Sequence, residues 1–244
     1  MLSEMRWSSL AVCLALCSAF TSNAVAYGQG KLPTPYTVVG GRVAISQFHT
    51  LEQPATAEGI FLNALVYFLN AQERDEEGKL PTITTDYDKH QIALEQTLNN
   101  QRTSSTYTYS LQVLVSDNII TVQALDIALV SQVSVVKLTK RLAFEKLNLD
   151  KKPQHREYLT EFATLFQTSI KELLEYIATN DPPVVTHYKE IKSQQVVKGM
   201  TKSEVLLAFG KPISVDEADG KLHWIYDSYV HVFFDDEVVV TVIN

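Results

Sequence analysis

The chain has 244 residues, of which 45% are hydrophobic and 20% charged, which is the composition of a globular protein. These values exclude wholesale disorder, collagen-like repeats and a polytopic membrane protein. With 21 Lys and Arg against 28 Asp and Glu, the formal net charge is 21 − 28 = −7. No stretch is rich in Lys and Arg, so we expect no nucleic acid as a partner.

Residues 1–26 have the pattern of a secretory signal peptide. The apolar run from Leu10 to Phe20 is too short to span a bilayer, and small residues follow it up to Ala26. We predict cleavage after Ala26 and export of the protein. A lipoprotein signal is the competing interpretation, because Cys13 and Cys17 each follow Leu-Ala-x, although the residue before each cysteine is larger than a lipobox prefers.

Both cysteines lie in this segment, so the mature chain of 244 − 26 = 218 residues contains none. This excludes disulfides, thiolate nucleophiles and zinc sites with cysteine ligands from the mature protein. Its length permits one or two domains.

Residues 27–41 contain several glycines and prolines, which keep regular structure short, so we expect a flexible lead-in there. Alternating apolar residues predict a strand over Arg42–Phe48. Thr56 can cap a helix over Ala57–Ala71, whose apolar residues recur at three- and four-residue spacing. The charged run Gln72–Gly78 then ends this helix as a solvated turn.

A second pattern, typical of strands, covers residues 82–136. Alternation over residues 107–115, the turn Ser116-Asp117-Asn118 and the run 119–129 predict a hairpin. An earlier strand around Ile92–Leu98 and a later one over Gln132–Leu138 complete a four- or five-stranded antiparallel sheet. Apolar residues spaced at close to 3.6 between Pro153 and Asn180 predict one long helix.

These elements predict a two-layer α+β domain over residues 42–181, because the sheet can bury one face only under the two helices. In the order of its elements, residues 42–180 resemble the small TATA-box-binding-protein-like domains of unknown function in exported bacterial proteins. The prolines at 182 and 183 cannot continue the long helix, and we place a domain boundary there.

Residues 182–244 form the second predicted α+β domain. Residues 186–197 form a short helix or an irregular lead. A helix over Lys202–Ala208 follows, in which Thr201 and Glu204 make a capping box and Val205 is buried. Gly210 is placed to take a left-handed conformation, and Pro212 stops the chain from continuing as helix.

Four strands are expected after this helix, over residues 213–216, 222–226, 229–233 and 237–243. Turns are expected at Asp219-Gly220, Asp227-Ser228 and Asp235-Asp236. A two-residue turn at 227–228 would pair Trp224 with His231 and Tyr226 with Tyr229. This pairing would place an aromatic stripe on one face, so Trp224, Tyr226 and Tyr229 are our candidate protein-binding residues.

The last sixty residues resemble the SmpA/OmlA (BamE-like) family of outer-membrane assembly proteins, within the β-lactamase-inhibitor-protein-like superfamily. The matching positions are Gly199, Met200, Thr201, Glu204, Val205, Gly210, Pro212, the strand at 224–226 and the turn at 233–236. The resemblance implies a helix–helix–three-strand fold, a periplasmic or outer-membrane location in a Gram-negative bacterium and a protein-binding role. Turn and cap geometry alone also explains these glycine, threonine and proline positions.

No catalytic or metal-binding pattern is present in the sequence. The six histidines lack the i, i+4 spacing of a zinc helix, and no nucleophile elbow, dinucleotide or phosphate-binding loop occurs. With a two-residue turn, His223 and His231 would point to opposite faces, which argues against a shared metal.

We therefore expect no catalytic, cofactor-binding or metal-binding residues and no enzymatic activity. The predicted function is that of an exported envelope protein that binds or scaffolds a protein partner. We expect a link to outer-membrane protein assembly, and peripheral association with that membrane is compatible with this function. An inhibitor or sensor that docks on a soluble envelope enzyme is the alternative, and an uncharacterised hydrolase is the third hypothesis.

Overall fold

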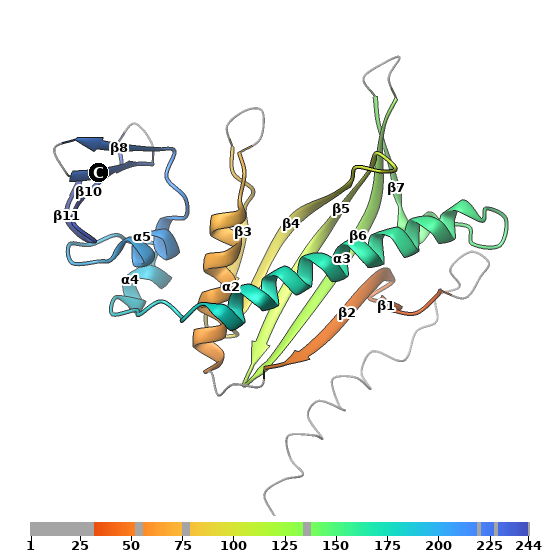
Figure 1. Ribbon diagram of the computed structural model, residues 1–244, viewed down its shortest axis with the longest axis horizontal. Coiled ribbons are helices and arrows are strands. Elements are labelled where there is room, and N and C mark those ends of the chain that lie inside the picture. The colour runs from red at the N-terminus through yellow and green to blue at the C-terminus, as the bar shows by residue number, and fades with distance from the viewer. Residues whose placement is uncertain are drawn as a thin grey trace, which may run out of the picture. The chain divides into compact units, whose positions relative to one another are not determined.

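The computed structural model of the protein describes residues 32–51, 56–74, 79–133, 138–218, 221–226 and 229–243 (Figure 1). The predicted signal peptide lies outside these residues, and so do the expected turns at Asp219-Gly220 and Asp227-Ser228 and residues 75–78 of the acidic run. None of the described helices has the length and apolar character that a membrane-crossing helix needs.

The fold is α+β with two antiparallel sheets, as the sequence predicts. The larger sheet has seven strands in the order β1-β2-β6-β5-β4-β3, with β7 paired to β6, and the smaller has the order β11-β10-β9-β8. The strands of the larger sheet are β1 (Tyr36–Val39), β2 (Arg42–Thr50), β3 (Ile83–Asp86), β4 (Gln91–Asn100), β5 (Ser105–Ser116), β6 (Ile119–Val133) and β7 (Leu138–Ala143). Those of the smaller sheet are β8 (Ser214–Ala218), β9 (Lys221–Ile225), β10 (His231–Asp235) and β11 (Val238–Ile243).

Close contacts divide the chain into two compact units. The first contains the described residues up to Gln47, with Glu95–Leu111 and Val122–Gln167. The second contains Phe48–Leu94, Gln112–Thr121 and Thr168–Asn244. Residues 182–244 thus share a unit with the helix at residues 57–71. The domain boundary predicted at residue 181 stays a prediction.

The core of the first unit is aromatic. Helix α3 (Gln154–Thr179) lies across the strands (Figure 1) and turns Phe162 and Phe166 toward Tyr109 of β5, at centroid distances of 5.3 and 5.7 Å. Tyr107 lies 5.6 Å from Phe162, and all four rings are buried. The predicted hairpin and long helix are therefore confirmed, and they bury the alternating side chains of β5 as the two-residue period requires.

The expected lead-in contains a strand that was not predicted from the sequence. Tyr36–Val39 forms β1 and pairs antiparallel with β2. Gly40 and Gly41 form the turn with φ of 54° and 81°, the positive values that a tight hairpin needs. Buried Tyr36 donates its hydroxyl proton to the carbonyl of Leu159 at 2.6 Å, so contacts far away in the chain hold this strand in place.

The prediction of one continuous strand over Gln132–Leu138 is wrong. Strand β6 runs on to Val133, and β7 begins at Leu138, with these two residues opposite one another. The two ends of the predicted strand are therefore paired with each other, and its residues 134–137 lie outside the described residues. Together with β1 and β3, this change gives seven strands rather than the four or five predicted.

Helix α2 (Ala57–Ala71) has the predicted limits, and the Oγ1 atom of Thr56 accepts the N–H of Gly59 at 3.1 Å as its N-cap. No basic residue lies in its last turn. Instead, the Nζ atom of Lys211 donates to the carbonyls of Asn70 and Gln72 at 3.3 and 3.1 Å. A cation at this end is favourable because the carbonyls of the last turn carry partial negative charge.

Two short helices complete the second unit. Helix α4 (Tyr188–Lys192) lies within the predicted segment 186–197, and α5 (Lys202–Phe209) extends the predicted helix by one residue. Helix α5 contacts both α4 and α2. The hydroxyl of Tyr87, between β3 and β4, donates to the carbonyl of Leu207 in α5 at 3.3 Å. Helix α5 is thus held from two sides within this unit.

Candidate protein-binding surface

The capping box predicted at the start of α5 is present. The Oγ1 atom of Thr201 accepts the N–H of Glu204 at 3.2 Å, and Oε2 of Glu204 accepts the N–H of Thr201 at 2.8 Å. These two bonds satisfy N–H groups that the first helical turn leaves without partners. Residues 201–204 alone therefore determine where the helix begins.

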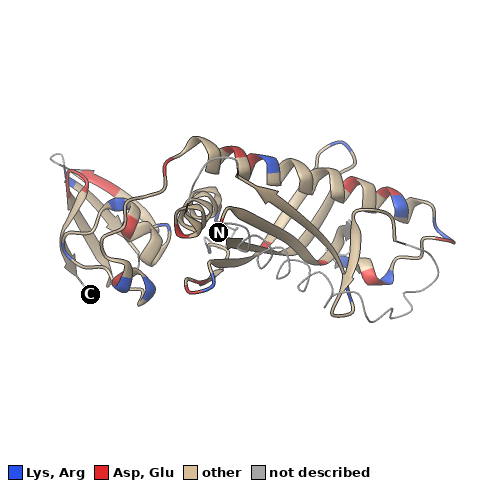
Figure 2. Ribbon diagram, turned by 90° about the horizontal axis from the view of Figure 1, so that it is seen from below, with Lys and Arg blue, Asp and Glu red and all other residues tan. Residues whose placement is uncertain are grey.

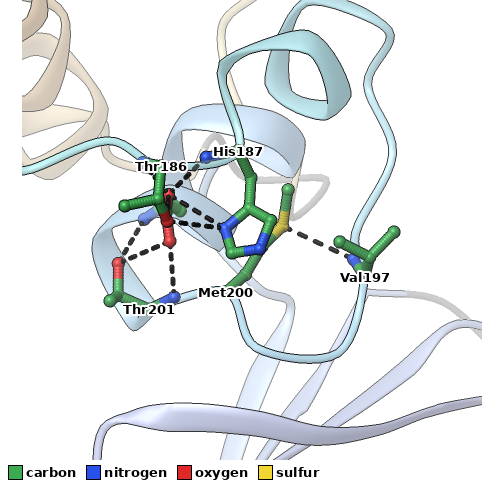
Figure 3. A network of polar contacts seen from close by, with 6 residues as sticks. Thr186, His187, Val197, Met200 and Thr201 are labelled. Atoms are coloured by element: carbon green, nitrogen blue, oxygen red, sulfur yellow. Dashed lines mark hydrogen bonds and ion pairs between the residues drawn. The ribbon is translucent and has the colours of Figure 1, made fainter.

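The second carboxylate oxygen of Glu204 holds a distant part of the chain (Figure 3). Its Oε1 atom accepts the N–H groups of Thr186 and His187 at 2.6 and 2.9 Å, and Nδ1 of His187 lies 3.1 Å away. The side chain is fully buried. Burial alone would raise the pKa of Glu204, but the backbone N–H groups of Thr201, Thr186 and His187 outweigh it and lower the pKa to about 2. Glu204 is therefore an anionic anchor between α5 and the segment before α4.

Gly199 and Met200 join the same anchor to the sheet. Gly199 has a φ of 97°, and its N–H donates to the carbonyl of Val239 in β11 at 3.0 Å. Val239 in turn donates its N–H to the carbonyl of Met200 at 2.8 Å. The Met200 side chain is fully buried, and its Sδ atom accepts the N–H of Val197 at 3.4 Å. Gly199 and Met200 therefore have structural roles, which explain why these residues occur at these positions.

Val205, Gly210 and Pro212 also take structural positions. Val205 is buried, and the carbonyl of Pro212 accepts a hydrogen bond from Arg74 at 2.7 Å. Gly210 is the C-cap of α5 with a φ of 75° and a ψ of −160°. The positive φ agrees with the prediction, but this ψ lies outside the left-handed helical region, in a region that is essentially restricted to glycine.

The pairing predicted for β9 and β10 is wrong by one residue. Ile225 is opposite His231, and Trp224 is opposite Val232. The N–H of Tyr226 donates to the carbonyl of Val230 at 3.0 Å, so three residues rather than two lie between the last hydrogen-bonded pair of the hairpin. Because side chains alternate between faces, a shift of one residue moves His231 to the other face of the sheet relative to Trp224.

This register divides the expected aromatic stripe. Trp224 packs on Phe234 at a centroid distance of 4.9 Å, on the face that holds buried Val232. Tyr226 packs on Phe209 of α5 at 5.3 Å, and its hydroxyl donates to the carbonyl of Gly210 at 2.9 Å. Burial raises the pKa of Tyr226 above its usual value. Tyr226 thus serves the packing between the sheet and α5, and Trp224 packs within the sheet on the same face.

The opposite face of the same sheet carries a ladder of rings. His223 stacks on Phe233 at a centroid distance of 4.2 Å and on His231 at 5.0 Å. The Nε2 atom of His223 lies 2.9 Å from Nδ1 of His231, and its Nδ1 atom lies 4.0 Å from the carboxylate of Asp216. The expectation that the two histidines point to opposite faces is therefore wrong. In the described part of the chain, no group of three or more metal-ligating residues could hold an ion.

Tyr229, the third residue of the expected stripe, is 76% exposed in the connection between β9 and β10. It does not stand alone in this region. Among the described residues eight large hydrophobic side chains are exposed, and five of them belong to residues 213–243. Those five are Ile213, Val215, Tyr229, Val238 and Ile243. They lie on both faces of the sheet, because Val215 is opposite Trp224 and Ile243 is opposite His231, which shares the other face with His223 and Phe233.

The second unit also contains an open hollow of about 300 Å³ between α2, β3 and α5. Leu69, Ile83 and Phe209 are among its lining residues, and Lys192 and Lys211 contribute the charged groups. No Asp, Glu or His lines it. The hollow therefore lacks the carboxylates and imidazoles that general acid–base chemistry most often uses.

Comparison with known proteins finds no protein family and no curated protein that matches the chain. A TBP-like protein from Parabacteroides distasonis is similar in structure, with 17% identity and a TM-score of 0.47, over 59% of this chain and 98% of that chain. A DUF4468 family protein from Bacteroides ovatus has 12% identity and a TM-score of 0.44, over 61% and 94%. The first is of the kind that residues 42–180 resemble. At these values neither match carries an argument about function, and neither bears on the SmpA/OmlA resemblance.

Proposed function

We propose that the protein is a non-enzymatic, exported envelope protein that binds a protein partner through its C-terminal sheet. The observation that supports this function most directly is the gathering of five exposed large hydrophobic side chains in residues 213–243. Such side chains are scattered singly over most soluble proteins. Five of them in one small sheet, on both of its faces, support contact with a partner there.

The structure of the sheet supports the same function. Helix α5 packs on one face through Phe209 and Tyr226, which leaves the ring ladder of His223, His231 and Phe233 on the other face. Planar side chains lose little conformational entropy on binding and are enriched at interface centres. A small rigid sheet that is packed on one side and half-open on the other is suited to recognition of a second protein.

The cellular setting belongs to the proposal as well. Export rests on the signal-peptide pattern of residues 1–26, and the link to outer-membrane protein assembly rests on the SmpA/OmlA resemblance. The alternative, an inhibitor or sensor of a soluble envelope enzyme, is favoured by Tyr229, because an exposed aromatic side chain in a strand connection can enter a cleft of a partner.

Surface variants test this function better than truncation. Removing residues 182–244 would take away α5, which contacts α2, and would uncover apolar side chains such as Leu69. We suggest crosslinking in intact cells with the double variant Tyr229→Ser and Ile243→Ser. The matched control is Phe48→Ser, which removes a side chain that is 63% exposed on β2 of the larger sheet.

The double variant should lose the crosslinked partner, and the control should keep it. Circular dichroism of the purified variants shows whether the fold is intact. Barrel-assembly components among the lost proteins would support the outer-membrane function, and one soluble enzyme would support the inhibitor alternative. Retention of every partner by the double variant would contradict binding through the C-terminal sheet.

A further inference from the structure

The negative charge of the protein is concentrated in its C-terminal sheet. Residues 213–244 contain seven Asp and Glu and one Lys, a net charge of 1 − 7 = −6 out of −7 for the whole chain. Two of these acids, Asp216 and Glu217, lie in β8 and are exposed. In Figure 2 a stretch of one strand in this sheet is correspondingly red. Such a field attracts cationic partners and repels anionic ones.

The two edges of this sheet differ. At the β11 edge, Gly199, Met200 and Lys202 make backbone hydrogen bonds to Val239 and Glu237. At the other edge, β8 pairs with β9, and no further strand pairs with it among the described residues. An edge strand presents N–H and C=O groups along its outer side, which an extended chain can pair with.

We propose that β8 accepts an extended, positively charged segment of a partner protein as a fifth strand of this sheet. The inference rests on the proposed protein-binding function and names the chemistry of the partner. Backbone hydrogen bonds to β8 supply the affinity, and the side chains on the two faces select the segment.

The side chains of β8 define what that segment contains. Asp216 lies on the face of the ring ladder, opposite His223 across the strands, and Glu217 lies on the other face, opposite Leu222. Lys or Arg at two neighbouring positions of the added strand can therefore meet one carboxylate on each face. Val215 and Ile213, which are 53% and 56% exposed, offer apolar contacts to β-branched residues beside them.

The charge also decides against other occupants. A second copy of this chain would bring another sheet of net charge −6 against the first, and like charges on neighbouring strands are destabilising. An anionic lipid surface or a nucleic acid would be repelled in the same way. A basic segment of another protein is the occupant that the charge favours.

The test uses the full chain labelled with ¹⁵N and two synthetic peptides of about six residues, the usual strand length. One has two adjacent Lys residues flanked by Val, and the other has two adjacent Glu residues at the same positions. The Lys peptide should slow hydrogen exchange of amides in Ser214–Ala218 and leave exchange in β11 unchanged, with weaker binding at high salt. The Glu peptide should have no effect.

A matched pair of variants locates the effect. Asp216→Asn with Glu217→Gln removes two charges from β8, and Asp235→Asn with Asp236→Asn removes two charges from the end of β10 and the turn after it in the same sheet. The first variant should weaken binding of the Lys peptide about tenfold and the second only about twofold. Peptide binding without slower exchange in β8, or equal weakening by both variants, would overturn the proposal.

The outcomes separate this inference from the proposed function. If the Tyr229 and Ile243 variant loses its partner in cells but the Lys peptide does not bind β8, the fifth strand is wrong and the protein-binding function stands. If the Lys peptide binds β8 as expected but the cellular partner is retained by that variant, the partner does not use the exposed apolar side chains, and the β8 edge keeps its support.

Discussion

The facing nitrogens of His223 and His231 lie 2.9 Å apart on the half-open face of the C-terminal sheet. A hydrogen bond between two imidazoles needs one ring to donate and the other to accept, so the pair holds a single shared proton between these nitrogens. The ring of His223 also stacks on Phe233. The ladder is therefore an organised surface feature, built from two strands in one register.

The stacking of His223 should be measurable in the stability of the protein. His223→Ala removes both the ring contact with Phe233 and the bond to His231, and we expect the free energy of unfolding to fall by about 1–2 kcal/mol. His223→Phe keeps the stack and should lose less. Urea unfolding of the two variants measures the difference. Equal stability of His223→Ala and the unchanged protein would show that the ladder contributes nothing to folding.

Glu204 is expected to be the most sensitive side chain of the C-terminal segment. Glu204→Gln places an amide N–H₂ group among the N–H groups of Thr186, His187 and Thr201, which need an acceptor. At neutral pH the free energy of unfolding should fall by about 3 kcal/mol, because the carboxylate pKa near 2 lies well below the usual value of 4.5. Glu157→Gln, at an exposed position on α3, is the control and should change stability little.

The pH dependence of this difference has a definite sign. A carboxylate whose pKa is lower in the folded state stabilises that state above its unfolded pKa, and the contribution is lost as the pH falls through the folded pKa. The stability difference between the unchanged protein and Glu204→Gln should therefore be largest above pH 4.5 and shrink toward pH 2. Unfolding curves at several pH values measure it, and a difference that is independent of pH in this range would contradict the role of the charge.

Gly210 should resist replacement for a conformational reason. A Cβ atom at this position would lie 3.7 Å from Leu69, an ordinary contact, but φ is 75° and ψ is −160°. Gly210→Ala should lower the free energy of unfolding by about 1–3 kcal/mol. Gly210→Asn should be no better tolerated, because asparagine relieves strain in the left-handed helical region and this residue lies outside it. Rescue by asparagine in thermal unfolding would argue for a left-handed conformation here.

Lys211 should stabilise α2 from a distance of 139 residues along the chain. Lys211→Met removes the cation from the carbonyls of Asn70 and Gln72, and we expect a loss of about 0.5–1 kcal/mol at low salt. High salt should reduce this loss because it screens the charge. Lys198→Met, at an exposed residue before α5, is the control. Denaturant unfolding at two salt concentrations tests the prediction, which fails if the two variants behave alike.

Local signals allowed several elements to be predicted from the sequence. Thr56 and the limits of α2, the Thr201–Glu204 capping box and the hairpin of β5 and β6 all appear as expected. Each depends on residues only a few positions apart, so the backbone groups that need partners and the side chains that supply them are visible together in the sequence.

The candidate surface was predicted only in part. Tyr229 is exposed as a binding residue requires, but Tyr226 packs on α5 and Trp224 packs within the sheet, and the ladder of His223, His231 and Phe233 was missed. The length of one strand connection caused both errors. A two-residue and a three-residue loop are both compatible with this sequence, and they place opposite sets of side chains on the same face.

The sequence by itself determined the α+β class, the helix limits and the concentration of negative charge in the last 32 residues, because composition, periodicity and capping are local properties. Only the tertiary structure decided the number of strands, their register, the attachment of Thr186 and His187 to Glu204 and the contact of Lys211 with the end of α2. These features depend on which distant segments meet, and the free energy that selects among such pairings comes from burial and hydrogen bonding across the whole chain.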